Sequence, residues 1–357
     1  MNFHKFDPRK TTREEALLLP DDDKRLYFKL VRLMHPRISE KLGDMLTLAM
    51  PDSGTSIVLL VGPTGVGKST LVSSLAHRII DSMRDEIESD PGFVPVVVMD
   101  APASGERGFS WRMFYLRLGD ALNEPLMDKK LEARVDGPKS IVHLPGLGST
   151  VTGMRVSVER VLAHRRTILV VVDEAVHLMR KAKGNTLDNH MDALKSLADT
   201  GATLVLIGAY DLLEFTTLSA QVARRTAIVH FNRYVTGIEE DERAFRTAIK
   251  QFQERMPLRK MPDLTERASE LQIACLGCIG ILKSTLAKTL AGVLQGGGKW
   301  SDSHLQKALF TQAQFNTILS ETLAGEAAIR EMEIGTGSFK SLTAKAKEIE
   351  FQARETA

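Results

Sequence analysis

The sequence has few cysteines, few aromatic residues and almost no net charge. Two cysteines among 357 residues are too few for the disulfide framework of a secreted domain, and they indicate a reducing compartment. No run approaches the roughly 20 consecutive apolar residues that a membrane span needs. The first ten residues are polar and lack the apolar core of a secretory signal. We therefore expect a cytoplasmic protein without a membrane partner.

The formal net charge is only +2, so a nucleic-acid surface would need local clustering of basic residues. A hydrophobic content of 43% and a charged content of 26% are ordinary for a globular protein, and the length admits one large or two modest domains. Cys275 and Cys278 have the spacing of half a zinc site. No second ligand pair stands nearby, and their apolar, helix-spaced surroundings favour buried structural thiols.

One glycine-rich stretch stands out because it lies between an apolar run at 56–61 and a helix-spaced run at 70–80. Strand, G-x-x-x-x-G-K-S and helix form the context of a phosphate-binding P-loop. Glycines let successive backbone N–H groups turn inward, and the helix N-terminus adds its positive end. Lys68 would reach the β- and γ-phosphates and Ser69 would hold Mg²⁺, so ATP and Mg²⁺ are the expected cofactors. The expected nucleotide-binding residues are Gly62, Pro63, Thr64, Gly65, Val66, Gly67, Lys68, Ser69, Thr70 and Asp173.

A second motif is the apolar run at 167–172 that ends in Asp173 and Glu174. After a P-loop, this pattern is typical of a Walker B element. Asp173 would orient Mg²⁺, and Glu174 would act as the general base on the attacking water. The alternative is a strand that ends in a helix N-cap, since aspartate there accepts backbone N–H groups.

Five apolar runs alternate with helical patterns, which predicts an α/β fold with a doubly wound parallel five-stranded sheet and its ligand at the strand carboxyl ends. The expected strands are residues 56–61, 93–99, 167–172, 203–208 and 227–231. Residues 124–153 mix proline, glycine and charge and give a poor signal, and within them we expect 145–150 to be irregular. A helix is expected at 156–164. The polar opening, to about residue 23, is expected to be an arm.

The strands stop after residue 236, where helical patterns at 239–255 and 263–294 predict a small helical lid. Gly277 and Gly280 break the second pattern, and three glycines at 296–298 form a linker. The expected divisions are an N-terminal arm and helices at 1–50, a nucleotide-binding core at 51–235, the lid at 236–298 and a helical tail at 299–357.

Arg224 and Arg225 stand just before the last strand. A guanidinium at that position indicates a finger that reaches the γ-phosphate of a neighbouring subunit. The alternative is a solvated surface pair. With Lys68 and Glu174, these two arginines complete the set of expected catalytic residues.

These motifs in order resemble an AAA+ ATPase: a P-loop, a Walker B element, a fourth strand, an arginine pair and a helical lid. More narrowly, the chain resembles the TniB/TnsC family, the ATP-dependent target-selection regulators of Tn-seven-type transposons. The narrower resemblance covers about residues 25–295. It rests on 62–69, on the loop 101–105 that leads to Trp111, on 172–178, on 194–197 and on the Gly-x-x-Gly pattern at 277–280.

The resemblance implies ATP-dependent assembly into homo-oligomeric rings or helical filaments on double-stranded DNA. The assembly would mark a target site and hand it to a transposase, so transposase and target-selector proteins are implied partners. The tail after residue 298 is the natural place for such a contact. Because relatives track DNA with inner loops and the helix after the second strand, Arg107, Thr152 and Arg155 are candidate DNA contacts. Lys139 is a further candidate.

Two positions depart from the AAA+ pattern. Gly208 and Ala209 stand where many relatives carry a polar sensor, and Gly280 stands where a lid arginine is common, with Lys283 the nearest cation. We therefore expect ATP hydrolysis to be slow or partner-stimulated.

Three other readings compete with the transposition regulator. An origin-initiator or helicase-loader ATPase normally needs a winged-helix or helix-turn-helix module after the lid, and the tail shows no such three-helix pattern. A P-loop small-molecule kinase would bind ATP as a monomer and make no use of the arginine pair. A non-enzymatic nucleotide switch would assemble on DNA without needing hydrolysis.

Overall fold

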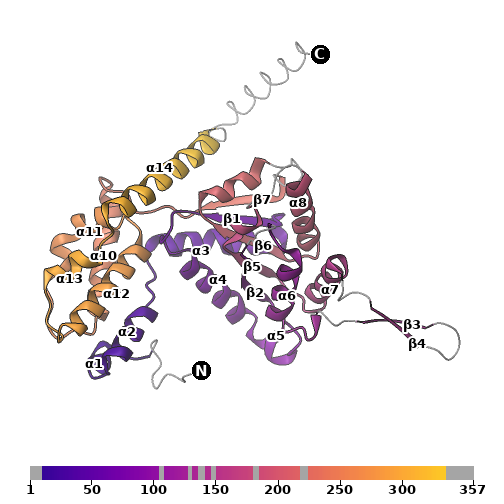
Figure 1. Cartoon of the computed structure of the whole chain (residues 1–357), viewed down its shortest axis with the longest axis horizontal. Helices are drawn as coiled ribbons and strands as arrows, with labels where there is room; N and C mark the ends of the chain where they lie inside the picture. The colour runs from indigo at the N-terminus through magenta and orange to yellow at the C-terminus, as the bar shows by residue number, and fades with distance from the viewer. Residues whose placement is uncertain are drawn as a thin grey trace, which may run out of the picture. The chain divides into compact units, whose positions relative to one another are not determined.

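The structure, a computed structural model, describes residues 10–103, 108–127, 131–135, 141–145, 150–179, 185–217 and 224–334. The chain divides into two compact units, Met1–Leu309 and Phe310–Ala357, and each is described by itself. Figure 1 shows a sheet within the first unit with helices packed around it.

A parallel five-stranded sheet organises the first unit, in the order β2-β5-β6-β1-β7. Its strands are β1 (Ile57–Val61), β2 (Val96–Asp100), β5 (Leu169–Asp173), β6 (Thr203–Gly208) and β7 (Thr226–His230). All five lie within two or three residues of the expected runs, so the predicted doubly wound sheet is confirmed. The central strands β1 and β6 are buried at every position, as a parallel sheet covered on both faces requires.

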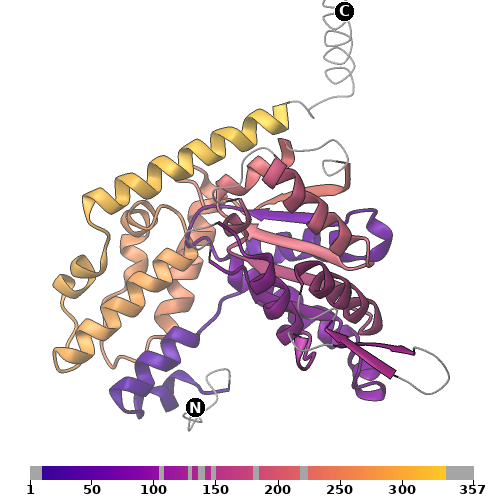
Figure 2. The same cartoon turned by 45° about the vertical axis from the view of Figure 1, so that its right-hand side comes forward.

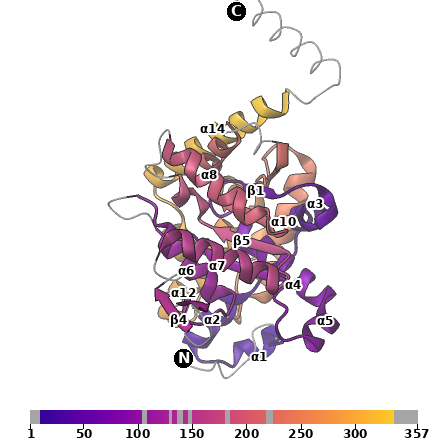
Figure 3. The ribbon, with the colours of Figure 1, turned by 90° about the vertical axis from the view of Figure 1, so that its right-hand side faces the viewer.

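Helices cover both faces of this sheet. The strand order forces the chain to cross from β1 over two strands to β2 and then to return, and right-handed crossovers put these connections on opposite faces. Figures 1 and 3 show the two groups on either side of the strands. One group holds α3 (Pro36–Ala49), α4 (Lys68–Ser82) and α5 (Arg84–Ser89), and the other holds α6 (Trp111–Ala121), α7 (Val151–His164) and α8 (Asn185–Ala198).

Local sequence signals fix where several helices begin. Ser110 caps α6 by accepting the N–H of Met113, and Thr150 caps α7 by accepting that of Gly153. Pro36 occupies the first turn of α3, where its missing N–H costs no hydrogen bond.

The region at 124–153, where the sequence signal is poor, contains regular elements. It contains β3 (Leu131–Val135) and β4 (Ile141–Pro145), an antiparallel pair in a sheet of its own, and α7 begins at Val151 rather than at 156. The helix was expected five residues too late, and the two strands were missed because each is only five residues long: Leu131, Ala133 and Val135 alternate with charged residues, but 141–145 shows no regular alternation.

After β7 the chain is helical. The elements are α10 (Glu239–Arg255), the 3₁₀ turn η5 (Leu264–Arg267), α11 (Ala268–Ala274), α12 (Ile279–Gln295) and α13 (Asp302–Ala308). The break between α11 and α12 falls at Leu276 and Gly277, which have φ angles of 53° and 67°. Glycine adopts such a left-handed conformation without steric cost.

Residues 13–30 are largely helical, which differs from the expected polar arm. They form α1 (Arg13–Leu17) and α2 (Asp21–Leu30), and α2 packs against α12. Figure 2 shows the indigo α1 and α2 beside the orange helices that follow β7. Arg13 donates to the carbonyls of Met256 and Leu258 at 3.0 and 2.7 Å, and Ala16 is fully buried.

The second unit contains α14 (Gln312–Ile334). Thr311 and Gln314 begin this helix with a reciprocal box, because each side chain accepts the other residue's backbone N–H. Within the described ranges no single helix is long and apolar enough to cross a membrane. The pair Leu264–Ala274 and Ile279–Gln295, bent by 119°, reaches that length and composition only when both are taken together.

Candidate functional site

The glycine-rich loop lies at the carboxyl end of β1, between Val61 and the first residue of α4. A Cβ on Gly62 would lie 2.3 Å from the carbonyl oxygen of Phe231, so no larger residue fits there. Gly65 and Gly67 have φ angles of 75° and 121°, which favour glycine. The loop therefore has the tight, inward-turned backbone that a phosphate cradle needs.

Three polar side chains, those of Lys68, Ser69 and Asp173, meet at this loop. Lys68 donates from Nζ to the carbonyls of Gly62 and Pro63 at 2.6 and 3.1 Å. Ser69 Oγ donates to Asp173 Oδ2 at 3.3 Å, which joins the start of α4 to the end of β5. Burial lowers the pKa of Lys68 to about 8, and the Asp173 carboxylate opposes that shift.

Glu174 follows β5 in a left-handed conformation with φ 52° and ψ 35°. A residue other than glycine pays about 1–2 kcal/mol for this conformation. Its backbone N–H donates to Asp173 Oδ1 at 2.8 Å, and its side chain is exposed. Strain of this kind clusters at functional sites, where it aims a side chain.

A tyrosine–histidine pair lies at the same edge of the sheet, and sequence reasoning missed it. His230 ends β7 and Gly208 ends β6, and both pair in register with Val61 directly before the loop. Tyr210 follows Gly208 closely, and its hydroxyl lies 3.0 Å from Nε2 of His230. The available signal was the position of each residue at a strand's carboxyl end, where ligands bind in parallel sheets.

The start of α12 closes over the loop. A Cβ on Gly280 would lie 2.4 Å from the carbonyl oxygen of Gly65, and a Cβ on Gly65 would lie 2.6 Å from Ile281 Cγ1. Gly280 therefore allows backbone-to-backbone approach at the position where a lid arginine is common. Lys283 is turned elsewhere, because its Nζ donates to the carbonyl of Lys29 at 2.7 Å.

The arginine pair lies at the opposite edge of the sheet from the loop. Arg225 accepts the N–H of Ser56 with its carbonyl oxygen, at the amino end of β1, and its side chain pairs with Asp199 at 2.9 Å. Arg224 is exposed, and no ion pair of its side chain is seen among the described residues. The structure therefore does not bring either arginine to the P-loop of its own chain.

The candidate DNA contacts are only partly described. Arg107 and Lys139 lie outside the described residues. Thr152 is exposed in the first turn of α7, and Arg155 lies 3.6 Å from Glu159 with 38% of its side chain exposed. Both line a cavity of about 280 Å³, together with Trp111, Tyr115, Val151, His190 and Ala193.

A larger cavity of about 700 Å³ adjoins the P-loop helix through Thr70. Its walls come from the chain before α3, from one face of α4 and from the end of α10. The lining residues are Leu30, Val31, Arg32, Met34, Leu42, Thr70, Ser73, Ser74, His77, Arg78, Asp81 and Arg255.

The two cysteines are buried thiols, as expected. Cys275 and Cys278 have exposed fractions of 0% and 1%, and burial raises the pKa of Cys275 to about 12. Across the described part of the chain, no group of three or more His, Cys, Asp or Glu side chains is arranged to hold a metal ion.

Residues 51–215 match the family model described as an AAA domain. Two solved structures share the fold. The ORC1 protein of Aeropyrum pernix, in complex with DNA, aligns with a TM-score of 0.53 and 17% identity over 83% of this chain and 68% of that one. The ORC2 protein of the same organism, in its ADPNP–ADP complexes, aligns with a TM-score of 0.50 and 12% identity over 78% and 69%. No curated protein sequence matches significantly.

The sheet order, the loop at the end of β1 and the AAA-domain match together define the AAA+ P-loop NTPase fold.

Proposed function

We propose that this AAA+ protein hydrolyses ATP, assembles on double-stranded DNA as a ring or helical filament, and selects target sites for a transposase. One observation supports the proposed assembly: the P-loop lies at the carboxyl ends of the strands of one sheet, and the arginine pair lies at their amino ends. The loop follows Val61, whereas Arg225 precedes Thr226, which pairs with Ile57 at the other end of β1. A five-residue strand spans about 15 Å, so a guanidinium on that edge would serve a nucleotide bound by a second copy.

The residues at the carboxyl edge fit ATP. Lys68 would exchange its carbonyl partners for the β- and γ-phosphates, and the glycine backbone would enclose them. The hydroxyl–carboxylate pair of Ser69 and Asp173 is the donor set that suits Mg²⁺, which would neutralise phosphate charge. Glu174 would take the proton of the attacking water. Lys68, Glu174 and one arginine of a neighbour would then form the catalytic set.

The nucleoside would extend from Thr70 into the cavity of about 700 Å³, which lies in the size range of small-molecule sites. Because residues before α3 and at the end of α10 line this cavity, nucleotide would contact both the segment before the core and the lid. We therefore retain the division into an N-terminal part, a core at 51–235, a lid at 236–298 and a tail as part of the proposal.

Support for a role in transposition comes from the TniB/TnsC resemblance. Its distinctive features are the loop at 101–105 with Trp111, in the segment after β2, and the Gly-x-x-Gly at 277–280, whose second glycine, Gly280, packs on Gly65 of the P-loop. The solved ORC1 with this fold is a complex with DNA, which supports a DNA partner here. Thr152 and Arg155 remain candidate phosphate contacts, with Arg107 and Lys139.

An origin-initiator or helicase-loader function is the second candidate. The likeness to the Aeropyrum pernix ORC1 protein, which extends over 83% of this chain, favours it. The two functions differ in what DNA they need. A target selector assembles on duplex of any sequence, whereas an initiator prefers its own sites over random DNA.

Electron microscopy of the purified chain with non-hydrolysable ATP and random duplex DNA tests the proposal. We expect rings or filaments that need both ligands, and a steep loss of DNA binding as salt is raised. Glu174→Gln should keep assembly and lose hydrolysis, whereas Lys68→Ala should lose nucleotide binding and assembly. Monomers that transfer phosphate to a small molecule would contradict it.

The transposition role needs a separate measurement. Deleting the coding sequence in its own host should reduce insertion of a marked transposon into a target plasmid and leave replication initiation unchanged. Loss of origin firing with normal insertion would instead establish the initiator function.

A further inference from the structure

A small cavity of about 280 Å³ lies where α6, α7 and α8 meet, and none of the residues that line it lines the larger cavity. Figure 3 shows α6 and α7 side by side. Trp111 and Val151, the first residues of these two helices, both line the cavity. Because the first turn of a helix leaves backbone N–H groups free and carries a partial positive charge, this end of the cavity favours an anion.

Aromatic side chains form the inner wall of this cavity. The ring of Trp111 lies 5.5 Å from that of Tyr115 and 5.5 Å from that of His190, measured between centroids. Tyr115 and His190 are only 1% and 6% exposed, so packing fixes the wall in place. A planar ring suits such a wall, because aromatic groups attract each other through their faces and edges.

Two polar atoms of the wall are left for a ligand to bind. Nδ1 of His190 lies 2.7 Å from the carbonyl oxygen of Leu178, so the neutral ring carries its proton there and leaves Nε2 as an acceptor. In the part of the chain that the structure describes, neither Nε2 nor the hydroxyl of Tyr115 makes a hydrogen bond. Neither is among the polar atoms that the protein encloses completely. Because buried tyrosine and histidine side chains usually find partners, both atoms are available to a group inside the cavity.

Arg155 brings a positive charge to the rim of the cavity. Its Nε lies 3.6 Å from Glu159, its side chain is 38% exposed, and within the described ranges no nitrogen of its guanidinium makes a hydrogen bond. The charge is close to the hydroxyl of Tyr115, because burial raises the pKa of that hydroxyl and Arg155 opposes the shift. The exposed Thr152 adds a hydroxyl from the first turn of α7. The rim therefore has the donors that a phosphate group needs.

We propose that the cavity between α6, α7 and α8 binds an unpaired nucleobase, with the adjoining phosphate held by Arg155 and Thr152 at the first turn of α7. A nucleotide unit matches both ends of the cavity, because its base offers a planar ring and N–H groups to the wall and its phosphate meets the guanidinium. An aromatic protein side chain would leave the guanidinium without an anion. The source of the base rests on the proposed function, in which DNA would supply it, and a free mononucleotide of the same chemistry is a separate arm of the test.

DNA in which one base is already unpaired should therefore be preferred. Taking a base out of a duplex costs free energy, and the cost is least where the base has no partner. We expect a duplex with a single extrahelical thymine to bind about tenfold more tightly than the same duplex without it, which is the size of one base–aromatic contact. Fluorescence anisotropy of labelled DNA, with the full chain and non-hydrolysable ATP, measures both affinities.

Trp111 reports on the cavity directly. The chain has two tryptophans, so Trp300→Phe leaves Trp111 as the only one. The duplex with the extrahelical thymine should quench its fluorescence, whereas the perfect duplex should not. Free thymidine monophosphate is titrated in the same way. Quenching by this mononucleotide, with equal affinities for the two duplexes, would keep the site and make a free nucleotide its ligand.

Two substitutions test the two ends of the cavity. Tyr115→Phe removes the hydroxyl and keeps the ring, and Arg155→Gln removes the charge. Each should reduce the preference for the unpaired base about three- to tenfold, as loss of one hydrogen-bonding group does. The matched control is Arg160→Gln, which makes the same charge change at an exposed position of α7 that does not line the cavity. The control should keep the preference, and an equal loss there would contradict a specific site.

The outcomes separate this inference from the proposed function. If the wild type binds neither duplex, the DNA partner of the proposed function is wrong, and quenching by thymidine monophosphate alone decides what the cavity binds. If it binds both duplexes equally and no nucleotide quenches Trp111, the inference is overturned and the proposed DNA partner stands. Quenching by N-acetyltyrosinamide and by no nucleotide would assign the cavity to a protein side chain and overturn the inference too. Thermal unfolding of each variant confirms that folded proteins are compared.

Discussion

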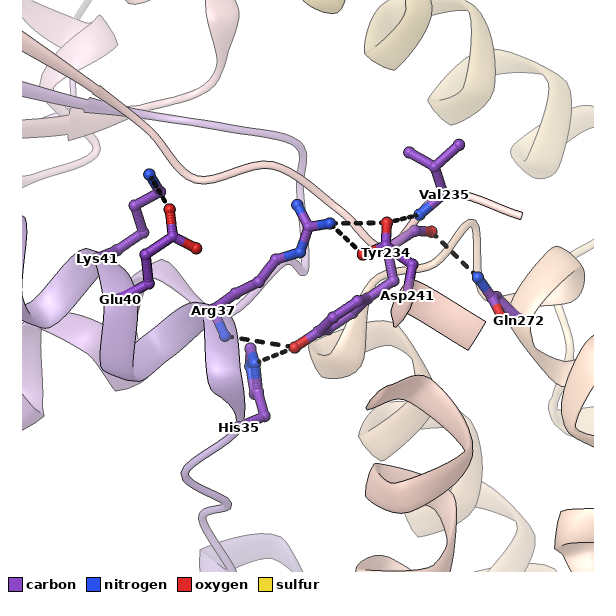
Figure 4. Close-up of polar contacts among 8 residues, drawn as sticks. All are labelled: His35, Arg37, Glu40, Lys41, Tyr234, Val235, Asp241 and Gln272. Atoms are coloured by element: carbon purple, nitrogen blue, oxygen red, sulfur yellow. Dashed lines mark hydrogen bonds and ion pairs between the residues drawn. The ribbon is translucent and has the colours of Figure 1, made fainter. Parts of the chain in front are cut away.

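The ion pair between Arg37 and Asp241 should be a main attachment of the proposed lid at 236–298 to the rest of the first unit. Arg37 Nη2 lies 2.6 and 2.7 Å from the two carboxylate oxygens, and the side chains are 13% and 10% exposed. The guanidinium carbon also lies 4.7 Å from the centre of the Tyr234 ring. Asp241 accepts the backbone N–H of Val235 at 2.7 Å, so one carboxylate holds three elements together (Figure 4).

Asp241→Asn keeps the shape of this side chain and removes its charge. Breaking a buried pair from one side costs 3–5 kcal/mol, because the remaining charge is left uncompensated. Since about a tenth of each side chain still meets solvent, we expect the low end of that range, about 3 kcal/mol lower free energy of unfolding.

Urea unfolding measures the loss, and a double-mutant cycle with Arg37→Met measures the coupling between the two residues. Asp241→Asn and Arg37→Met together should cost much less than the sum of the single changes. The matched control is Arg243 and Glu239, an ion pair on the same helix at 3.6 Å with side chains 67% and 84% exposed. Arg243→Met should cost under about 0.5 kcal/mol, as exposed pairs do.

Two results would refute this reasoning. A cost for Asp241→Asn as small as that of Arg243→Met would show that the buried charge is compensated elsewhere. Additive effects in the cycle would show that Arg37 and Asp241 act independently, and that the Asp241–Val235 bond accounts for the loss.

Three further predictions concern the nucleotide site. Arg224→Ala should reduce ATP turnover about a hundredfold or more, and Arg225→Ala should reduce it far less, because the side chain of Arg225 is already paired with Asp199 of its own chain. If the finger acts between copies, mixing the Arg224→Ala variant with a Lys68→Ala variant should restore some ATP turnover. No recovery of turnover in the mixture would contradict a finger between copies. Gly280→Ala should weaken ATP binding, because the added methyl group displaces α12 from Gly65. A titration with ATP measures the affinity, and an unchanged affinity would show that the lid moves freely. Lys68, with a pKa of about 8, is half protonated at pH 8, and bound phosphate favours its charged form. ATP binding at pH 8 should therefore take up as much as about half a proton, and the affinity for ATP should fall as the pH rises further. Calorimetry in buffers of different ionisation enthalpy measures this uptake, and finding none would contradict the prediction.

The sequence predicts the phosphate end of this site well, because its chemistry needs contiguous residues. The loop at 62–69 and the strand end at 173–174 are each readable as a short pattern. Parallel pairing then brings them together, since β5 and β1 end at the same edge of the sheet. The same parallel pairing puts the start of β7, with Arg225, at the other edge, so strand order alone separates the arginines from the P-loop of their own chain, as the proposed role between copies requires.

The remainder of the site depends on contacts between distant residues, which no local pattern encodes. Nδ1 of His35 lies 2.9 Å from the hydroxyl of Tyr234 although the two residues are 199 positions apart, and Arg37 and Asp241 are 204 apart. In the sequence, His35 and Pro36 mark only the break before a helix, and Asp241 is one acid among several at the start of α10. The residues that precede the core also read as a polar arm, because short helices such as α1 bury a single alanine and show no apolar stripe.

Gly280 belongs both to a short sequence pattern, the Gly-x-x-Gly at 277–280, and to a contact between distant residues, its packing on Gly65. A glycine at this position leaves no side chain there, and a Cβ would lie 2.4 Å from the carbonyl oxygen of Gly65, so α12 approaches the P-loop through its backbone. The lid therefore meets the phosphate loop through backbone and reaches the segment before α3 through the Arg37–Asp241 pair. Because the segment before α3 also lines the cavity of about 700 Å³, a nucleoside bound there would contact the same segment that the Arg37–Asp241 pair ties to α10. ATP occupancy, rather than phosphate sensing by an arginine, would then set the position of the lid.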